Sequence, residues 1–135
     1  SGRFILDMTS IKVLDIEDEK WNKKLEKHLK AEDFFGVSFY PKAIFEFSKA
    51  TPLKGAKVDE PNYHFKGNLT LKGITHALDF DALVDLNKSG ASASGQIIVD
   101  RTKYNIRYKS NSFFDGLGDN AIYDEFSITF HVLTK

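Results

Sequence analysis

The strongest constraint on the fold lies between Asn62 and Leu86, where apolar residues occupy every second position of two consecutive stretches. The two apolar rows are Tyr63, Phe65, Leu69 and Leu71, followed by Leu78, Phe80, Ala82, Val84 and Leu86. A period of two is typical of a β-strand with one apolar face. Between the rows, Lys72-Gly73 supplies a turn, because glycine adopts positive φ at no steric cost. The stretch therefore predicts an antiparallel hairpin whose apolar rows share one face of a sheet.

Length and composition fit one domain over residues 1–135. The chain has 135 residues, of which 41% are hydrophobic, so it can bury one core of its own and has no room for two. Its twelve phenylalanines are large apolar side chains, each worth roughly 2 to 3 kcal/mol when fully buried, and they need one another or a ligand. The chain opens with Ser1-Gly2 and no methionine, which indicates a processed or cloned start.

Charge, hydropathy and cysteine content exclude several classes of function. Nineteen basic residues balance nineteen acidic ones, and no stretch concentrates one sign, so we expect no nucleic-acid partner. No apolar run reaches the roughly 18 residues of a membrane span, so we expect no stable membrane insertion. The absence of cysteine removes disulfides, thiolate nucleophiles and thiolate metal sites.

A change of period predicts a strand and then a helix near the N-terminus. Residues 3–13 alternate as a strand, with Phe4, Leu6 and Met8 on one face. From Asp18 an apolar stripe follows helical spacing, formed by Trp21, Leu25, His28 and Leu29. Acidic residues crowd the start of this helix and lysines its end, which complements the helix dipole. We expect the helix to lie across the sheet and cover it.

The remaining strands follow the period of two. The further alternating or β-branched stretches are 43–48, 90–100, 104–108 and 126–132. Small residues fill 90–95, a composition that a flexible linker shares, but we expect them to begin a strand where something bulky presses close. Residues 115–120 predict a long turn. The count is six or seven strands and one helix, which predicts an all-β, mainly antiparallel fold: either a sandwich whose inner rows meet, or a barrel whose inner rows line a cavity.

A search for catalytic and metal-binding patterns gives no site. The four histidines are His28, His64, His76 and His131, and none has a second histidine at metal-ligand spacing. Gly116-x-Gly118-x-x-Ala121 matches a dinucleotide pattern by letter, but it precedes a strand and lacks the helix dipole that holds a pyrophosphate. A calcium site could use Asp115, Asp119, Asn120 and Asp124, although their spacing is not that of an EF-hand. We expect no catalytic residue, no metal, no cofactor and no enzymatic activity.

Four separated motifs resemble the successive signatures of the YceI-like family. They are Lys27-His28-Leu29-Lys30-x-x-Asp33-Phe34-Phe35, Tyr40-Pro41-x-x-x-Phe45-x-x-Ser48, Gly67-Asn68-Leu69-Thr70-Leu71-Lys72-Gly73-Ile74-Thr75 and Asp100-Arg101-Thr102-x-Tyr104-x-Ile106. The resemblance runs from about Phe4 to the C-terminus. It implies a lipocalin-like antiparallel β-barrel, covered by one helix and enclosing a long apolar tunnel. It also implies binding of polyisoprenoid chains and, for many members, a periplasmic or secreted location in bacteria.

Two features of the sequence depart from the family pattern. Family members usually carry further N-terminal strands before the segment equivalent to Phe4-Leu6-Met8, and this chain starts there, which would leave the barrel incomplete. An unpaired first strand would favour pairing with another chain, such as a homodimer through that edge. The other departure is Asn105, where the family commonly has glycine; asparagine tolerates left-handed geometry, so the turn is retained.

The apolar row of each strand gives the candidate ligand-binding residues. They are Phe45, Phe47, Phe65, Leu69, Leu71, Phe80, Val84, Phe126, Ile128 and Phe130. For each of them, core packing and contact with an isoprenoid lipid (a polyprenyl chain or isoprenoid quinone) are both open. Arg101 has two readings as well, contact with a pyrophosphate or quinone head group at the barrel mouth, or a structural salt bridge. The leading functional hypothesis is non-enzymatic lipid binding or transport. The alternatives are a β-domain with a filled core acting in assembly or stress response, and an enzyme on an apolar substrate.

Overall fold

The computed structural model describes residues 1–14, 16–110 and 123–134. In this part the chain forms six strands, one α-helix and two 3-10 helices. The strands are β1 (Gly2–Asp7), β2 (Lys42–Pro52), β3 (Tyr63–Leu71), β4 (Ile74–Asn87), β5 (Gly90–Asp100) and β6 (Glu125–Leu133). The helix α1 spans Glu19–Lys30, and the 3-10 helices η1 (Met8–Ser10) and η2 (Arg101–Tyr104) follow β1 and β5.

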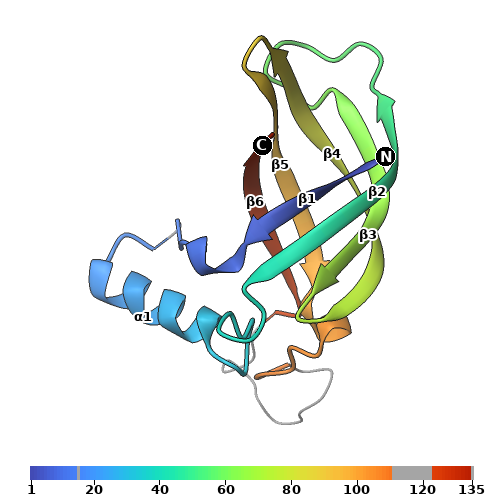
Figure 1. Cartoon of the computed structure of the whole chain (residues 1–135). Helices are drawn as coiled ribbons and strands as arrows, with labels where there is room; N and C mark the ends of the chain where they lie inside the picture. Colours follow the sequence, from blue (N-terminus) through green and yellow to red (C-terminus); the bar gives the residue numbers. More distant parts are fainter. Residues whose placement is uncertain (15, 111–122, 135) are drawn as a thin grey trace.

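The strands form one antiparallel sheet in the order β1-β2-β3-β4-β5-β6, so each strand pairs with its neighbour in sequence. The sheet curls until β1 comes back toward β6 (Figure 1), where the rings of Phe4 and Phe130 lie 6.3 Å apart. Within the described residues, β1 and β6 share no backbone pairing. The predicted all-β antiparallel architecture is confirmed, as a curled half-barrel that is open along one side.

The central hairpin is confirmed. β3 and β4 pair with Phe65 opposite Phe80, so their apolar rows share the inner face. Lys72 (φ 52°) and Gly73 (φ 78°) both adopt left-handed geometry, which matches the right-handed twist of the flanking strands. The expectation for residues 90–95 is confirmed too, since β5 starts at Gly90. A side chain on Gly95 would lie 3.3 Å from the tip of the Phe130 ring and 3.0 Å from the Asp81 carbonyl oxygen.

Two of the predicted strands differ from the structure. The first ends at Asp7 instead of continuing to residue 13, because the Asp7 carboxylate accepts hydrogen bonds from the backbone N–H (3.0 Å) and hydroxyl (2.6 Å) of Thr9 and starts η1. The alternation at 104–108 is no strand, because η2 ends there in left-handed Asn105 (φ 60°). Tyr104 and Ile106 are both buried, whereas Asn105 between them is exposed. The apolar–polar alternation in the sequence reflects this burial and not a strand. The turn predicted at 115–120 lies outside the described residues.

The helix forms where predicted but is placed differently. Asp18 caps α1 by accepting a hydrogen bond from the Trp21 backbone N–H at 3.1 Å, as the acidic start of the helix indicated. However, α1 extends away from one end of the sheet (Figure 1), and no residue along its length is buried. Asn22 ties it to the preceding segment by donating to the carbonyl oxygens of Val13 (2.7 Å) and Ile16 (3.0 Å). The expectation that the helix covers the barrel is therefore wrong.

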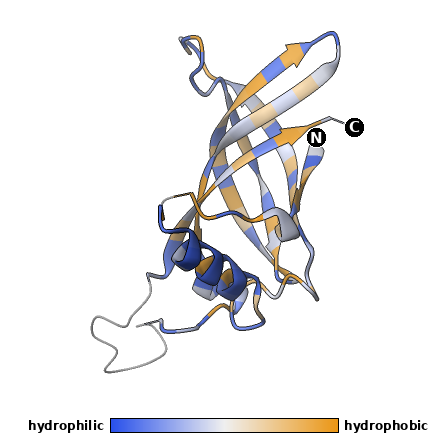
Figure 2. Ribbon diagram, turned by 90° about the vertical axis from the view of Figure 1, so that its left-hand side faces the viewer, coloured by the Kyte–Doolittle hydropathy of each residue, from blue (hydrophilic) through white to orange (hydrophobic). Residues whose placement is uncertain are grey.

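The core lies inside the curl of the sheet. Figure 2 shows hydrophobic and hydrophilic residues alternating along the strands, while most of α1 is hydrophilic. The inner rows form one cluster that extends to Phe34 and Phe35, just after α1. Phe35 contacts Phe126 of β6 with ring centroids 5.3 Å apart. These two phenylalanines, rather than α1, extend the core beyond the sheet.

Candidate functional site

The inner face of the half-barrel is the candidate site, and it holds every apolar candidate from the sequence. Six of the ten are buried in the core cluster and four pack against it while partly buried. The buried ones are Phe45, Phe65, Leu69, Leu71, Phe80 and Phe130, and the partly buried ones are Phe47, Val84, Phe126 and Ile128. The period of two along each strand therefore identified the inner face correctly. Whether these side chains contact a ligand is a separate question.

The interior is filled by aromatic rings that contact one another. Phe4 of β1 lies at the centre, with ring centroids 5.2 Å from Phe65, 5.3 Å from Phe47 and 6.3 Å from Phe130. Phe80 stacks on Phe65 at 5.5 Å and meets the edge of Phe130 at 5.4 Å. Offset and edge-to-face contacts of this kind stabilise a core beyond the area that they bury.

The space left between these rings is small. Eight apolar side chains enclose a cavity of about 10 Å³, namely those of Phe4, Leu6, Phe45, Leu69, Leu78, Phe80, Ile97 and Phe130. A cavity of this size holds about one water molecule. Among the described residues, the long apolar tunnel that the family resemblance implied is therefore not open, because the inner rows of the curled sheet close on one another.

Four of the eight cavity residues were missing from the candidate list. They are Phe4, Leu6, Leu78 and Ile97. A signal for them exists in the sequence, since Phe4 and Leu6 alternate in the first strand and Leu78 belongs to the apolar row of the hairpin. Ile97 was harder to assign because it lies in a continuous apolar run, where the structure buries Ile97 and Val99 and leaves Ile98 62% exposed.

Arg101 lies in the protein interior rather than at an open mouth. Its side chain is 1% exposed, and it donates hydrogen bonds to the carbonyl oxygens of Tyr123 (2.9 Å) and Ile106 (3.0 Å). The guanidinium also lies 5.5 Å from the centre of the Phe34 ring. Burial lowers the pKa of Arg101, and the charge of Asp124 opposes that shift. This geometry favours the structural reading of Arg101, which holds the turn after β5 against the start of β6.

The outer face of the hairpin carries a separate polar group. His64 Nδ1 lies 2.7 Å from a carboxylate oxygen of Asp81, and its Nε2 lies 3.6 Å from one of Asp79. The hydrogen bond to Asp81 raises the pKa of His64, with a contribution from the charges of both aspartates. Both aspartates are exposed. The group lies on the opposite side of the sheet from the cavity, so it takes no part in the apolar site.

Comparison with known proteins decides the family. A model of the YceI-like domain matches residues 1–133. The chain belongs to the YceI-like family. The four motifs that carry the resemblance thus identified it correctly, and the match extends over nearly the whole chain.

Relatives of this YceI-like domain come from bacteria. A UPF0312 protein of Staphylococcus aureus (strain bovine RF122 / ET3-1) is 32% identical over 96 residues, which is 64% of this chain and 49% of that protein. A UPF0312 protein of Pectobacterium atrosepticum is 37% identical over 57 residues, covering 42% of this chain and 27% of that protein. The chain therefore spans about half the length, or less, of these curated relatives.

Solved structures agree on the fold of this YceI-like domain. The crystal structure of BcnA from Burkholderia cenocepacia has a TM-score of 0.65 and 25% identity, covering 98% of this chain and 73% of that one. The YceI protein of Campylobacter jejuni has a TM-score of 0.59 and 18% identity, covering 98% of this chain and 71% of that one. In the described part of the chain, no helix has the length and apolar character needed to cross a membrane.

Proposed function

We propose that this YceI-like domain binds an isoprenoid-type lipid, without catalysing a reaction, between the apolar inner rows of its curled sheet. The observation that carries the proposal is how β1 and β6 meet at the open side of the barrel. Phe4 and Phe130 meet there through their rings, with centroids 6.3 Å apart, while the sheet order leaves these two strands unpaired in the described residues. Separating β1 from β6 breaks side-chain contacts and no backbone hydrogen bond between them. A lipid can therefore replace ring contacts with its own.

The energetics favour a long apolar ligand. Each buried methylene contributes about 0.8 kcal/mol, so a five-carbon prenyl unit contributes roughly 4 kcal/mol. Association and ordering cost on the order of 4 to 15 kcal/mol, and the displaced rings lose some of their contacts. Several prenyl units are thus needed before binding becomes tight, whereas a short apolar molecule gains too little. The surrounding side chains are all apolar, so the proposed site selects for length and flexibility and not for a polar group.

A second function is favoured by one specific observation. The cavity of about 10 Å³ and the interlocked phenylalanines are what a β-domain with a filled core would have. Such a domain would act through its surface in assembly or in a stress response. Lipid content separates the two functions, because only the first requires a lipid between the inner rows.

Replacing Leu78 with tryptophan tests the proposal. Leu78 lines the cavity, and the larger ring would fill the space that a lipid has to occupy. Ile98→Trp is the matched control, because Ile98 is 62% exposed on the outer face of β5. Each protein is purified from its native host, extracted with organic solvent and analysed by mass spectrometry. We expect the unmodified protein and the control to carry an isoprenoid lipid in near-stoichiometric amount, and Leu78→Trp to carry roughly tenfold less, in line with the cost of overpacking.

Circular dichroism and thermal unfolding would verify that both variants remain folded. No lipid in the unmodified protein, or equal lipid in the two variants, contradicts the proposal, and the first result favours the filled-core function. We further propose a periplasmic or secreted location, supported by family membership. Fractionation of the native host, with immunodetection of the protein, tests it, and recovery from the cytoplasm alone would contradict it.

A further inference from the structure

The outward face of α1 leaves a tryptophan side chain in solvent. Trp21 is the single tryptophan of the chain and is 58% exposed. Together with Leu25 and His28 it lines an open groove of about 570 Å³ along the helix. At the other end of the stripe, Leu29 packs against the core. The half of α1 that projects from the sheet therefore presents this part of its apolar stripe outward.

The charges of α1 itself are unbalanced, while acidic residues flank the helix at both ends, with Glu17 and Asp18 before it and Glu32 and Asp33 after it. α1 carries five lysines and two glutamates, although the whole chain has a formal net charge of zero. Both glutamates are engaged locally: Glu19 pairs with Lys23 at 3.0 Å, and Glu26 accepts a hydrogen bond from the Val13 backbone N–H at 2.9 Å. The other four lysines form no ion pair with any described residue; they are Lys20, Lys24, Lys27 and Lys30. The partner of this face is therefore expected to be anionic.

We propose that α1 docks this end of the molecule onto an anionic membrane surface. An amphipathic helix with lysines on its polar side and a tryptophan on the other is suited to lie in the plane of the lipid head groups. The tryptophan ring has an apolar body and a polar N–H, the combination that is stable at that depth. The lysines attract the head groups from the flank, and Lys24 Nζ already lies 4.8 Å from the centre of the Trp21 ring.

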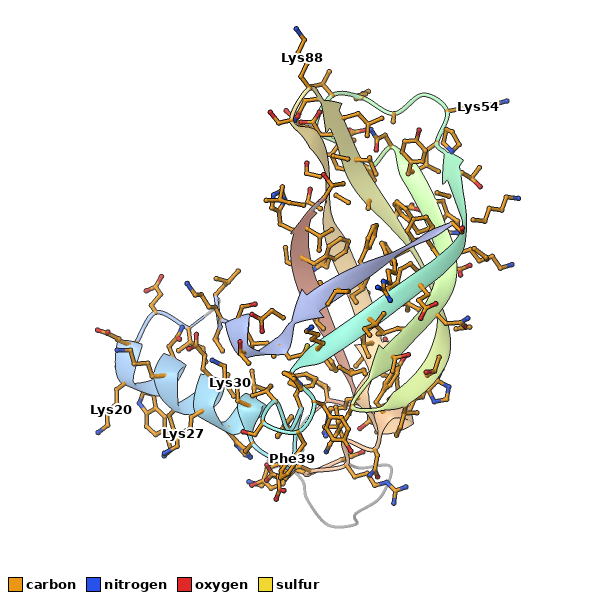
Figure 3. The ribbon with its side chains drawn as sticks, in the orientation of Figure 1. Lys20, Lys27, Lys30, Phe39, Lys54 and Lys88 are labelled. Carbon is orange, nitrogen blue, oxygen red and sulfur yellow. The ribbon has the colours of Figure 1, made fainter. Side chains whose placement is uncertain are left out.

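A second exposed aromatic residue lies at the same end of the molecule. Phe39, in the loop after α1, is 68% exposed. Figure 3 shows Phe39 near the end of α1 that carries Lys27 and Lys30, while Lys54 and Lys88 lie at the opposite end of the sheet. Trp21 and Phe39 therefore provide two apolar contact points among lysines. Together with the lysines of α1 they form the proposed membrane-facing surface.

The docking surface is independent of the cavity. It rests on α1 and its flanking loop, whereas the proposed lipid ligand rests on the inner rows of the sheet. The two proposals are complementary, because a protein that exchanges an apolar chain has to reach the membrane where such chains reside. Each can fail without the other: vesicle binding reports the docking surface, and extracted lipid reports the interior.

The fluorescence of Trp21 measures the docking directly, because no other tryptophan contributes. The full chain is titrated with vesicles of phosphatidylcholine containing phosphatidylglycerol, and with vesicles of phosphatidylcholine alone. We expect a blue shift of the emission with the anionic vesicles only, and its loss at high salt, which screens surface charges. Each lysine near an anionic surface is worth roughly a fivefold change in partitioning. Lys20→Glu/Lys27→Glu should therefore raise the half-saturating lipid concentration by at least about 25-fold.

The matched control moves the same charges to the other end of the molecule. Lys54→Glu/Lys88→Glu has the same net charge as the α1 variant, and both positions are exposed, so we expect less than about a twofold effect from long-range attraction alone. Equal weakening by the two double variants would overturn the proposal, as would an unshifted emission with anionic vesicles. A blue shift that depends on protein concentration without vesicles would assign the face to a contact between two copies and would overturn it as well.

Discussion

At the scale of single residues, His64 gives the protein a defined pH response. Its hydrogen bond to Asp81, and then the charges of Asp81 and Asp79, raise its pKa above the ordinary value of 6.5. A pKa that is higher in the folded state means that protonation stabilises the fold. This contribution is fully present below the unfolded pKa and is lost as the pH rises through the folded pKa. The pair is solvent-exposed, so the effect on stability is small.

We predict that Asp81→Asn lowers the pKa of His64, because it removes the charge that hydrogen-bonds to the ring. The measurement is an NMR titration of the His64 ring signals in both proteins. Unfolding in urea below about pH 6 and above about pH 8 should show that the extra stability on the acidic side shrinks in the variant. Asp85→Asn is the control, since Asp85 is exposed on the same strand, while the aspartates beside the ring are Asp79 and Asp81. An unchanged His64 titration in Asp81→Asn would refute the assignment.

The inward-facing side chains show how far the sequence predicts the candidate site. Phe80 and Phe130 face inward as the period of two requires, because alternate side chains of a strand point to opposite faces. Whether facing rows leave a tunnel or close on each other depends on the curl of the sheet, which brings Phe4 against Phe130 from opposite ends of the chain. No local pattern encodes that distance. The inner face was therefore predictable, and the small volume that it encloses was not.

At the scale of elements, local hydrogen bonds decided the outcomes that periodicity missed. Asp7 ends β1 early by capping η1, and Asp100 does the same for η2 by accepting a hydrogen bond from the Thr102 backbone N–H at 3.0 Å. In both places an aspartate lies two residues before a threonine, so a capping pattern was available in the sequence. The position of α1 could not be predicted from a local pattern, because it depends on the hydrogen bonds that Asn22 donates to the carbonyl oxygens of Val13 and Ile16.

The hairpin turn between β3 and β4 offers a stability test at this scale. Gly73 has a φ of 78°, and a side chain there would lie 3.2 Å from the Tyr40 ring. Gly73→Ala therefore combines left-handed strain of about 1 kcal/mol with a tight contact. Gly55→Ala is the matched control, since Gly55 has a similar φ of 75° and open space around it. We expect the control to lose about 1 kcal/mol and Gly73→Ala to lose more, measured by urea unfolding. Equal losses would show that Tyr40 moves aside freely.

At the scale of the whole molecule, the proposed lipid binding requires one side of the barrel to open. The backbone ladder is continuous from β1 through β2, β3, β4 and β5 to β6, so the opening is expected between the two end strands. Admitting an apolar chain there widens the gap by about one strand spacing, roughly 5 Å. Distances that cross this gap should change when lipid binds, and distances within the continuous sheet should not.

Spin labels can measure this difference because the chain contains no cysteine of its own. The first label pair is Ile5→Cys with Gln96→Cys, on the outer faces of β1 and β5, which lie on either side of the gap. The control pair is Lys66→Cys with Gln96→Cys, on β3 and β5, which the hydrogen bonds of β4 connect. Addition of geranylgeraniol should lengthen the first distance by about 5 Å and leave the second unchanged, as measured by double electron–electron resonance. If lipid binds and both distances stay constant, the chain enters by another route; if both lengthen together, the sheet expands as a unit and the separation of β1 from β6 is excluded.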